Sequence, residues 1–149
     1  MGVERSYSEG DDIPPLSKTI TQEKINLFEG SSGRTGPSQF TDEETARERL
    51  GTRGTVASGR VTLTFALELL RRYFCSDVYN RTGMVDVRFL RPTRPGDTIT
   101  LTGSVTSVTR EANGNRVTVS INATNQNGDT TGVGTGSAVV PSGYMPAQE

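Results

Sequence analysis

The stretch 31–50, SSGRTGPSQFTDEETARERL, joins a glycine-rich loop to an acidic helical turn, a combination typical of a small-molecule site. Proton transfer at neutral pH is most often carried by histidine, and the chain contains none. A histidine-based triad or general base is therefore excluded. The weak candidates that remain are Asp42, which opens the helical turn, and Asp86, on a later segment. With one cysteine and no histidine, zinc or haem ligation is not expected, and no cofactor is predicted.

The chain of 149 residues has the size of one domain, and we assign 1–149 to it, with ends of about 1–8 and 142–149 expected to be flexible. Its 16 basic and 17 acidic residues nearly balance, which argues against a nucleic-acid or membrane-surface partner. No apolar stretch approaches a membrane span, and no signal peptide is recognised at the start. The single Cys75 cannot form an internal disulfide, so a cytoplasmic location is expected.

Three helices are predicted before the strands begin. The first covers 21–29, the second 42–50, and the third starts after an N-cap at Ser58 and ends near Phe74. The third helix carries apolar residues on nearly every face, which predicts that it is buried at the centre of the domain. The segment before the first helix, to about 17, is polar and contains prolines, and it is expected to lie along the surface.

After the central helix the period of the apolar residues changes to two, which predicts strands at 85–89, 99–105, 117–123 and 131–140. The turns Pro95-Gly96-Asp97, Asn113-Gly114-Asn115 and Asn127-Gly128-Asp129 suit hairpins, so the strands are expected to form one antiparallel meander. A sheet that curls around a central helix is the hotdog fold, of class α+β.

Three segments resemble MaoC-like hydratases and dehydratases. "EGDDIPPLSKTITQEKINLF" is similar to the N-terminal segment of that family, and "VRFLRPTRPGDTITLTGSV" resembles its most recognisable strand-turn-strand, with Pro92, Pro95, Gly96 and Asp97 where the family pattern has them. The closing "VTVSINATNQNGDTTGVGTGSAVV" resembles its last hairpin. The resemblance covers about 9–141 and implies the hotdog fold.

In that family the chemistry belongs to a "G-D-x-N-P-x-H-x-D" loop, whose aspartate and histidine activate water at an enoyl thioester. The matching stretch here is "GRTGPSQFTD", in which Arg34 or Thr35 replaces the aspartate and Gln39 or Phe40 replaces the histidine. Asp42 matches the trailing aspartate, which usually caps a helix. The resemblance therefore implies that the Asp/His dyad is missing and that the family's ordinary hydration cannot run.

The family's second motif, "H-G-m" at the start of the central helix, reads Ser58-Gly59-Arg60 here. In the family, backbone N–H groups at this point hold the thioester oxygen, a role that needs a helix N-terminus and a glycine but no side chain. Gly59 and Arg60 can still fill it. For Arg60, a ligand contact and a salt bridge to a nearby carboxylate are equally open.

These positions give the expected substrate-binding set: Arg34, Gln39, Phe40, Ser58, Gly59 and Arg60. The leading hypothesis is a diverged MaoC-like enzyme that acts on an acyl or carbonyl compound, by dehydration, isomerisation or cyclisation, in specialised biosynthesis. The alternatives are a non-catalytic subunit that partners a catalytic hydratase, and an acyl-ligand binding protein. A homodimer is expected, because a single hotdog leaves a sheet edge and a helix flank exposed.

Overall fold

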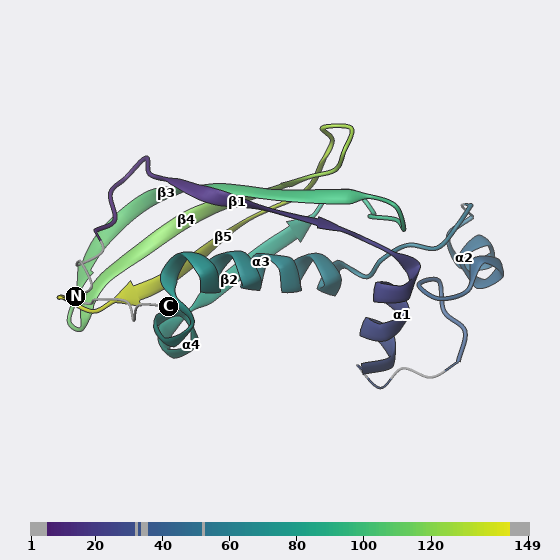
Figure 1. Cartoon of the computed structure of the whole chain (residues 1–149), viewed down its shortest axis with the longest axis horizontal. Helices are drawn as coiled ribbons and strands as arrows, with labels where there is room; N and C mark the ends of the chain where they lie inside the picture. The colour runs from purple at the N-terminus through teal and green to yellow at the C-terminus, as the bar shows by residue number, and fades with distance from the viewer. Residues whose placement is uncertain (1–5, 32, 34–35, 52, 144–149) are drawn as a thin grey trace.

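The computed structural model describes residues 6–31, 33, 36–51 and 53–143. Its elements are β1 (Asp12–Thr19), α1 (Gln22–Ser31), α2 (Glu43–Leu50), α3 (Gly59–Phe74), α4 (Ser76–Thr82), β2 (Met84–Phe89), β3 (Thr98–Glu111), β4 (Gly114–Thr124) and β5 (Thr130–Val140). Figure 1 shows α3 lying across the concave side of one curved sheet, with α1 and α2 beyond one end of α3 and α4 under the other. The predicted α+β hotdog fold is confirmed. The ends expected to be flexible lie mostly outside the described residues.

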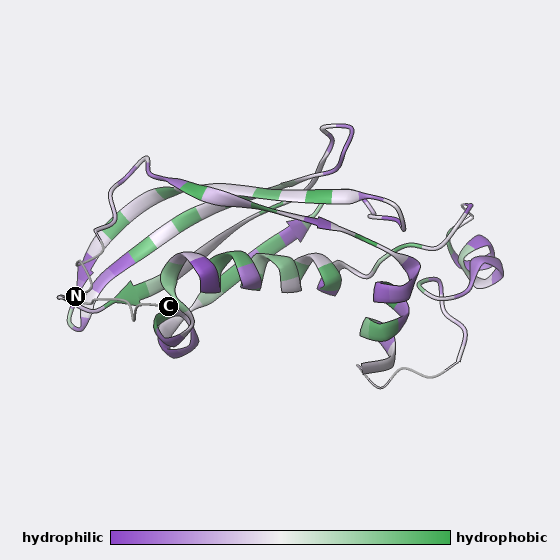
Figure 2. Ribbon diagram, in the orientation of Figure 1, coloured by the Kyte–Doolittle hydropathy of each residue, from purple (hydrophilic) through white to green (hydrophobic). Residues whose placement is uncertain are grey.

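The three predicted helices are present, and α3 begins as predicted after Ser58. Its inner face is fully buried at Ala66, Leu70 and Phe74, while Leu63 and Phe65 are only half-buried within this chain. The strands β3 and β4 alternate apolar and polar residues, visible as green and pale segments in Figure 2. The apolar side of this alternation packs against α3 and forms the core.

The sheet order, β1-β3-β4-β5-β2, corrects the predicted meander. Only β3, β4 and β5 follow one another as hairpins, whereas β2 pairs with β5 at the far edge. The turn at Pro95-Gly96-Asp97 does not join a β2–β3 hairpin. Instead, Gly96 N–H donates to Ile20 O and Ile20 N–H to Asp97 O, both at 2.7 Å, so this turn is paired with the end of β1. The segment 90–97 thus carries the chain from one edge of the sheet to the other side.

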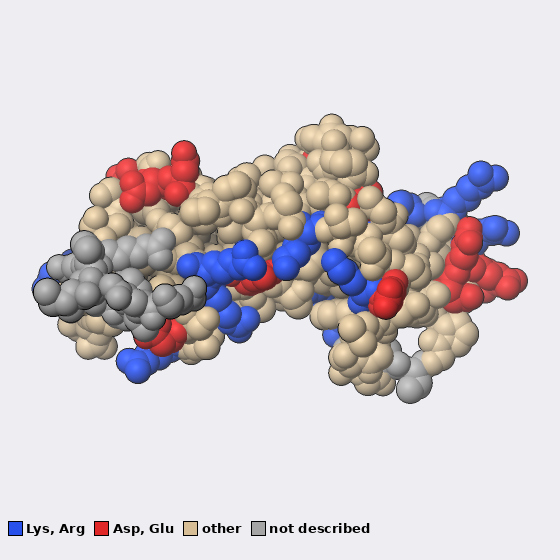
Figure 3. Space-filling view, viewed as in Figure 1, with Lys and Arg blue, Asp and Glu red and all other residues tan. Residues whose placement is uncertain are grey.

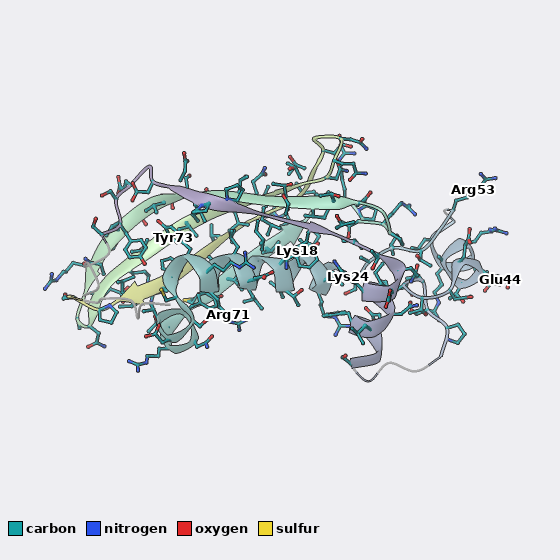
Figure 4. All side chains as sticks on the ribbon, in the orientation of Figure 1. Lys18, Lys24, Glu44, Arg53, Arg71 and Tyr73 are labelled. Atoms are coloured by element: carbon teal, nitrogen blue, oxygen red, sulfur yellow. The ribbon has the colours of Figure 1, made fainter. Side chains whose placement is uncertain are left out.

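Two elements were not predicted. The N-terminal segment forms β1, an edge strand antiparallel to β3, with a register shift between Ile13 and Leu16 where Pro14 and Pro15 stand. Proline cannot donate a hydrogen bond within a sheet, so it is tolerated only at an edge strand or a bulge. The two prolines therefore favoured a surface segment over a strand in the prediction from sequence. Lys18 on β1 forms a 3.0 Å salt bridge to Glu68 on α3, and Figure 4 shows Lys18 directly over that helix. The helix α4 is short and lacks a capping side chain, so it gave no sequence signal.

Candidate functional site

The N-terminus of α3 is built by a serine cap. The Ser58 side chain, itself buried, accepts a hydrogen bond from Arg60 N–H at 3.1 Å, and Val61 N–H donates to Ser58 O at 2.9 Å. Among the described residues, none accepts a hydrogen bond from Gly59 N–H. Because the first N–H groups of a helix have no partner within it, Gly59 offers the open donor of this turn. Of the two backbone donors expected here, the Arg60 N–H is already used by the cap.

A cavity of about 240 Å³ adjoins this turn. Gly59 and Thr62 of α3 line one side, and the segment 89–93 after β2 lines another. The Phe89 ring lies so close to Gly59 that a side-chain Cβ there would stand 2.7 Å from it. Glycine is therefore needed at 59 for the approach of Phe89 as well as for access to the backbone N–H.

Arg60 faces a buried carboxylate. Its Nη2 lies 3.8 Å from Oε2 of Glu29 on α1, and its guanidinium stands over the Phe28 ring, 5.7 Å from the centroid. The Arg60 side chain is 47% exposed, while that of Glu29 is only 3% exposed. Of the two alternatives for Arg60, the structure contains the salt bridge. Glu29 was missed from the sequence, although its spacing of four from the buried Ile25 places both on one helix face.

The loop after α1 is tied to the start of α3 through its backbone. Gln39 O accepts from Val56 N–H at 3.2 Å, and the Gln39 side chain accepts from Arg49 at 2.9 Å. Phe40 is half-buried against the core. Arg34 and its alternative Thr35 lie outside the described residues.

The two weak acid candidates are placed apart. Asp42 is the N-cap of α2, and its carboxylate accepts from Thr45 N–H at 2.9 Å and from Thr45 Oγ1 at 2.6 Å. These hydrogen bonds hold the pKa of Asp42 below its ordinary value. Asp86 on β2 is exposed, and its sequence neighbours Val85 and Val87 pack against the core. Because side chains alternate between the two faces of a strand, the Asp86 side chain lies on the outer face of the sheet.

We expect Asp42→Asn to lower the melting temperature at neutral pH and to lose this effect in acid. A carboxylate whose folded pKa is depressed stabilises the fold above its unfolded pKa, near 3.8, and the contribution disappears as the pH falls through the folded value. Thermal melts of both proteins between pH 7 and pH 2 measure the difference. Glu48→Gln, an exposed acid later in α2, serves as the control. An effect of Asp42→Asn that is constant with pH would contradict the cap role.

Charged side chains of both signs lie side by side at the α2 end of the molecule, as Figure 3 shows.

Among the described residues, no three carboxylates or thiols are gathered as a group that could hold a metal ion. Within the same residues, none of the helices has the length and apolar content needed to cross a bilayer.

The profile of the MaoC-like domain matches residues 9–127, most of the chain. The chain belongs to the MaoC-like domain family. No curated protein matches it at a significant level. The resemblance drawn from the three quoted segments is thereby confirmed.

Several solved structures share the fold. A monoamine oxidase regulatory protein from Archaeoglobus fulgidus is 27% identical, with a TM-score of 0.76 and 90% of each chain covered. A MaoC-like dehydratase from Rhodospirillum rubrum is 24% identical, with a TM-score of 0.73 over 94% of this chain and 95% of that one. An (R)-hydratase from A. caviae involved in PHA biosynthesis is 20% identical, with a TM-score of 0.73 over 93% of this chain and all of that one.

Proposed function

We propose that the chain is a diverged MaoC-like enzyme that binds an acyl or other carbonyl compound at the N-terminus of α3. The proposed reaction is a dehydration, an isomerisation or a cyclisation. We propose that it belongs to a specialised biosynthetic pathway in the cytoplasm. The observation that supports this proposal best is the open Gly59 N–H at the start of α3, beside the cavity lined by Gly59 and Thr62. A preorganised N–H donor at a helix N-terminus stabilises negative charge that develops on a carbonyl oxygen.

The remaining proposed residues shape the polar end of this site. Arg60 supplies a fixed positive charge, Gln39 an amide, and Phe40 an apolar face, and Arg34 is retained as a proposed contact. Ser58 has an indirect role: its hydroxyl accepts the hydrogen bond of the Arg60 N–H, and this leaves the Gly59 N–H as the open donor. The site therefore suits a ligand with one carbonyl or carboxylate group on an otherwise apolar body.

We expect Arg60→Ala and Gln39→Ala each to weaken the binding of a butanoyl pantetheine thioester by about five- to tenfold, the effect of losing one polar contact. Isothermal titration calorimetry measures the affinity. Gln39→Ala should leave the melting temperature nearly unchanged, since the hydrogen bond that its side chain accepts from Arg49 is exposed to solvent. Arg53→Ala, at the α2 end in Figure 4, is the matched control for loss of an arginine. Unchanged affinity in both variants, with reduced stability, would place the site elsewhere.

A homodimer is proposed on the strength of the exposed edge strand. Among the described strands, β2 pairs with β5 alone. Its Met84 is 63% exposed and its Phe89 45% exposed, and the following Leu90 is 51% exposed. Association through this edge would bury these side chains, together with Leu63 and Phe65 of α3, which are half-buried in a single chain. Light scattering coupled to size-exclusion chromatography should give twice the chain mass, and a monomer at micromolar concentration would contradict the proposal.

A non-catalytic subunit is the second candidate. The chain has no histidine. Its structural neighbours include two Mycobacterium tuberculosis complexes of paired chains, ChsH1–ChsH2 and the dehydratase HadBC, at 15% and 20% identity. On this alternative, the chain gains hydratase activity only when expressed together with a MaoC-like partner. Activity of the chain alone toward any acyl compound would favour the first candidate.

A further inference from the structure

Two buried threonine hydroxyls have no hydrogen-bond partner among the described residues. Thr62 on α3 is 3% exposed, and Thr93, in the segment after β2, is 5% exposed. A helical threonine can donate its hydroxyl to a carbonyl of the preceding turn, as Thr64 does to Val61 O at 2.6 Å, but Thr62 does not. The other buried serines and threonines of the described chain are all paired through their hydroxyls: Thr55, Ser58, Thr131 and Ser137. Buried polar groups are normally paired, so the two exceptions indicate a partner from outside the chain.

Both threonines face the same cavity. They line the cavity of about 240 Å³ beside Gly59, and their hydroxyl oxygens are open to it. Thr62 follows Gly59 by three residues, so the two lie on one face of α3, about 4.5 Å apart along the helix axis. The open N–H of Gly59 therefore shares the cavity with two hydroxyls, each of which can donate and accept a hydrogen bond.

The wall that carries Thr93 is fixed by backbone hydrogen bonds on two sides. Ala57 N–H donates to Thr93 O at 2.8 Å, in an isolated antiparallel bridge that ties this wall to the residues before α3. Leu90 N–H donates to Thr131 O at 2.8 Å, which ties the wall to the start of β5. The rest of the lining includes the apolar residues Ala57, Phe89, Leu90 and Pro92. Unpaired hydroxyls held in such a cavity discriminate between a ligand that can pair with them and one that cannot.

We propose that Thr62 and Thr93 are specificity-determining residues that bind a second, uncharged oxygen of the ligand, an inference that rests on the proposed function. Besides the carbonyl oxygen held by Gly59 N–H, the acyl chain then carries a keto or hydroxyl oxygen within about one helical turn, ~5.4 Å, of it. An uncharged group fits because Arg91 is the single charged residue in the described lining, and it is exposed. A plain alkyl chain leaves both hydroxyls unpaired and binds less tightly.

Filling of the cavity by water alone is the rival explanation. A cavity of this size has room for water molecules, and a water that bonds both hydroxyls would satisfy them without a ligand. The two explanations differ in what they predict for ligand preference. Ordered water gives the oxygenated chain no advantage, whereas the proposed role makes affinity depend on the second oxygen.

Calorimetry with matched probes separates these explanations. The full chain is titrated with the pentanoyl and 4-oxopentanoyl thioesters of pantetheine, which differ by one keto oxygen, and with the 4-hydroxypentanoyl thioester, which shows which oxygen group is preferred. We expect the preferred oxygenated probe to bind about tenfold more tightly than the pentanoyl probe. Thr62→Val and Thr93→Val retain the side-chain shape without the hydroxyl, and each should reduce this preference to about threefold or less. Thr64→Val, the same change at an exposed position of α3 outside the cavity, should keep the full preference.

The melting temperature of each free protein is the second readout. Thr62→Val and Thr93→Val should melt no lower than the wild type, because each replaces an unpaired hydroxyl by a methyl group. If neither oxygenated probe binds more tightly than the pentanoyl probe, or if both valine variants keep the preference, the role of the threonines is overturned while the carbonyl site stands. A lower melting temperature with an unchanged preference identifies a structural or water-binding role and also overturns it. If no probe binds to the wild type, the proposed function itself fails, and this inference with it.

Discussion

The purified chain is expected to hydrate a crotonyl thioester at no measurable rate. Hydration needs one group that activates the water and another that delivers the proton, and in the family's loop an aspartate and a histidine serve these ends. The predicted match puts Arg34 or Thr35 at the aspartate position and Gln39 or Phe40 at the histidine position, and none of these side chains is a base at neutral pH. Loss of general acid–base assistance alone costs about 10²- to 10⁴-fold for each group.

Loss of absorbance at the enoyl thioester band measures this reaction, with a MaoC-like hydratase that retains the dyad as the positive control. The assay is informative only if the chain binds the thioester, so calorimetry under the same conditions accompanies it. Turnover within tenfold of the control would show that the chain hydrates the thioester without the dyad. It would contradict the prediction that the changed loop cannot support hydration.

The largest effect on stability is expected where α3 packs on the sheet. Leu70 is fully buried, and its side chain meets Gly136 of β5 so closely that a Cβ at 136 would lie 2.6 Å from a Leu70 methyl group. Leu70→Ala should therefore cost about 2–5 kcal/mol, the usual range for emptying a core position. Gly136→Ala should cost about 1–3 kcal/mol through overpacking. The double variant should be more stable than the sum of the two effects predicts, because the new methyl group enters the space that Leu70 vacates.

Urea unfolding of the four proteins measures these free energies. Leu27→Ala, at a leucine that is 72% exposed, is the matched control and should stay within about 0.5 kcal/mol of the wild type. Gly30→Ala on α1, where nothing lies within 4 Å of the added methyl group, is the control for glycine replacement. Strict additivity of Leu70→Ala and Gly136→Ala would contradict the contact between them.

The proposed site was predictable only in part. Ser58 and Gly59 could be found because a cap and a following glycine are local signals that one sequence carries by itself. Glu29 could not be found, because burial of a glutamate depends on which loops and helices close over α1. The pairing of Arg60 with Glu29 joins two helices that are far apart in the chain, and no local pattern selects it over a ligand contact.

For the fold, the buried central helix, the alternating pattern of β3 and β4, and the family could all be predicted from the sequence. These features depend on the spacing of apolar residues, on capping residues and on turn residues that are neighbours along the chain. The tertiary structure alone decided that Pro14 and Pro15 stand at a register shift of an edge strand and that β2 pairs with β5 instead of β3. It also brought Phe89 onto Gly59. Strand order and such contacts arise from long-range packing of the sheet around α3, where several pairings satisfy the same alternating pattern and only the closed core selects one.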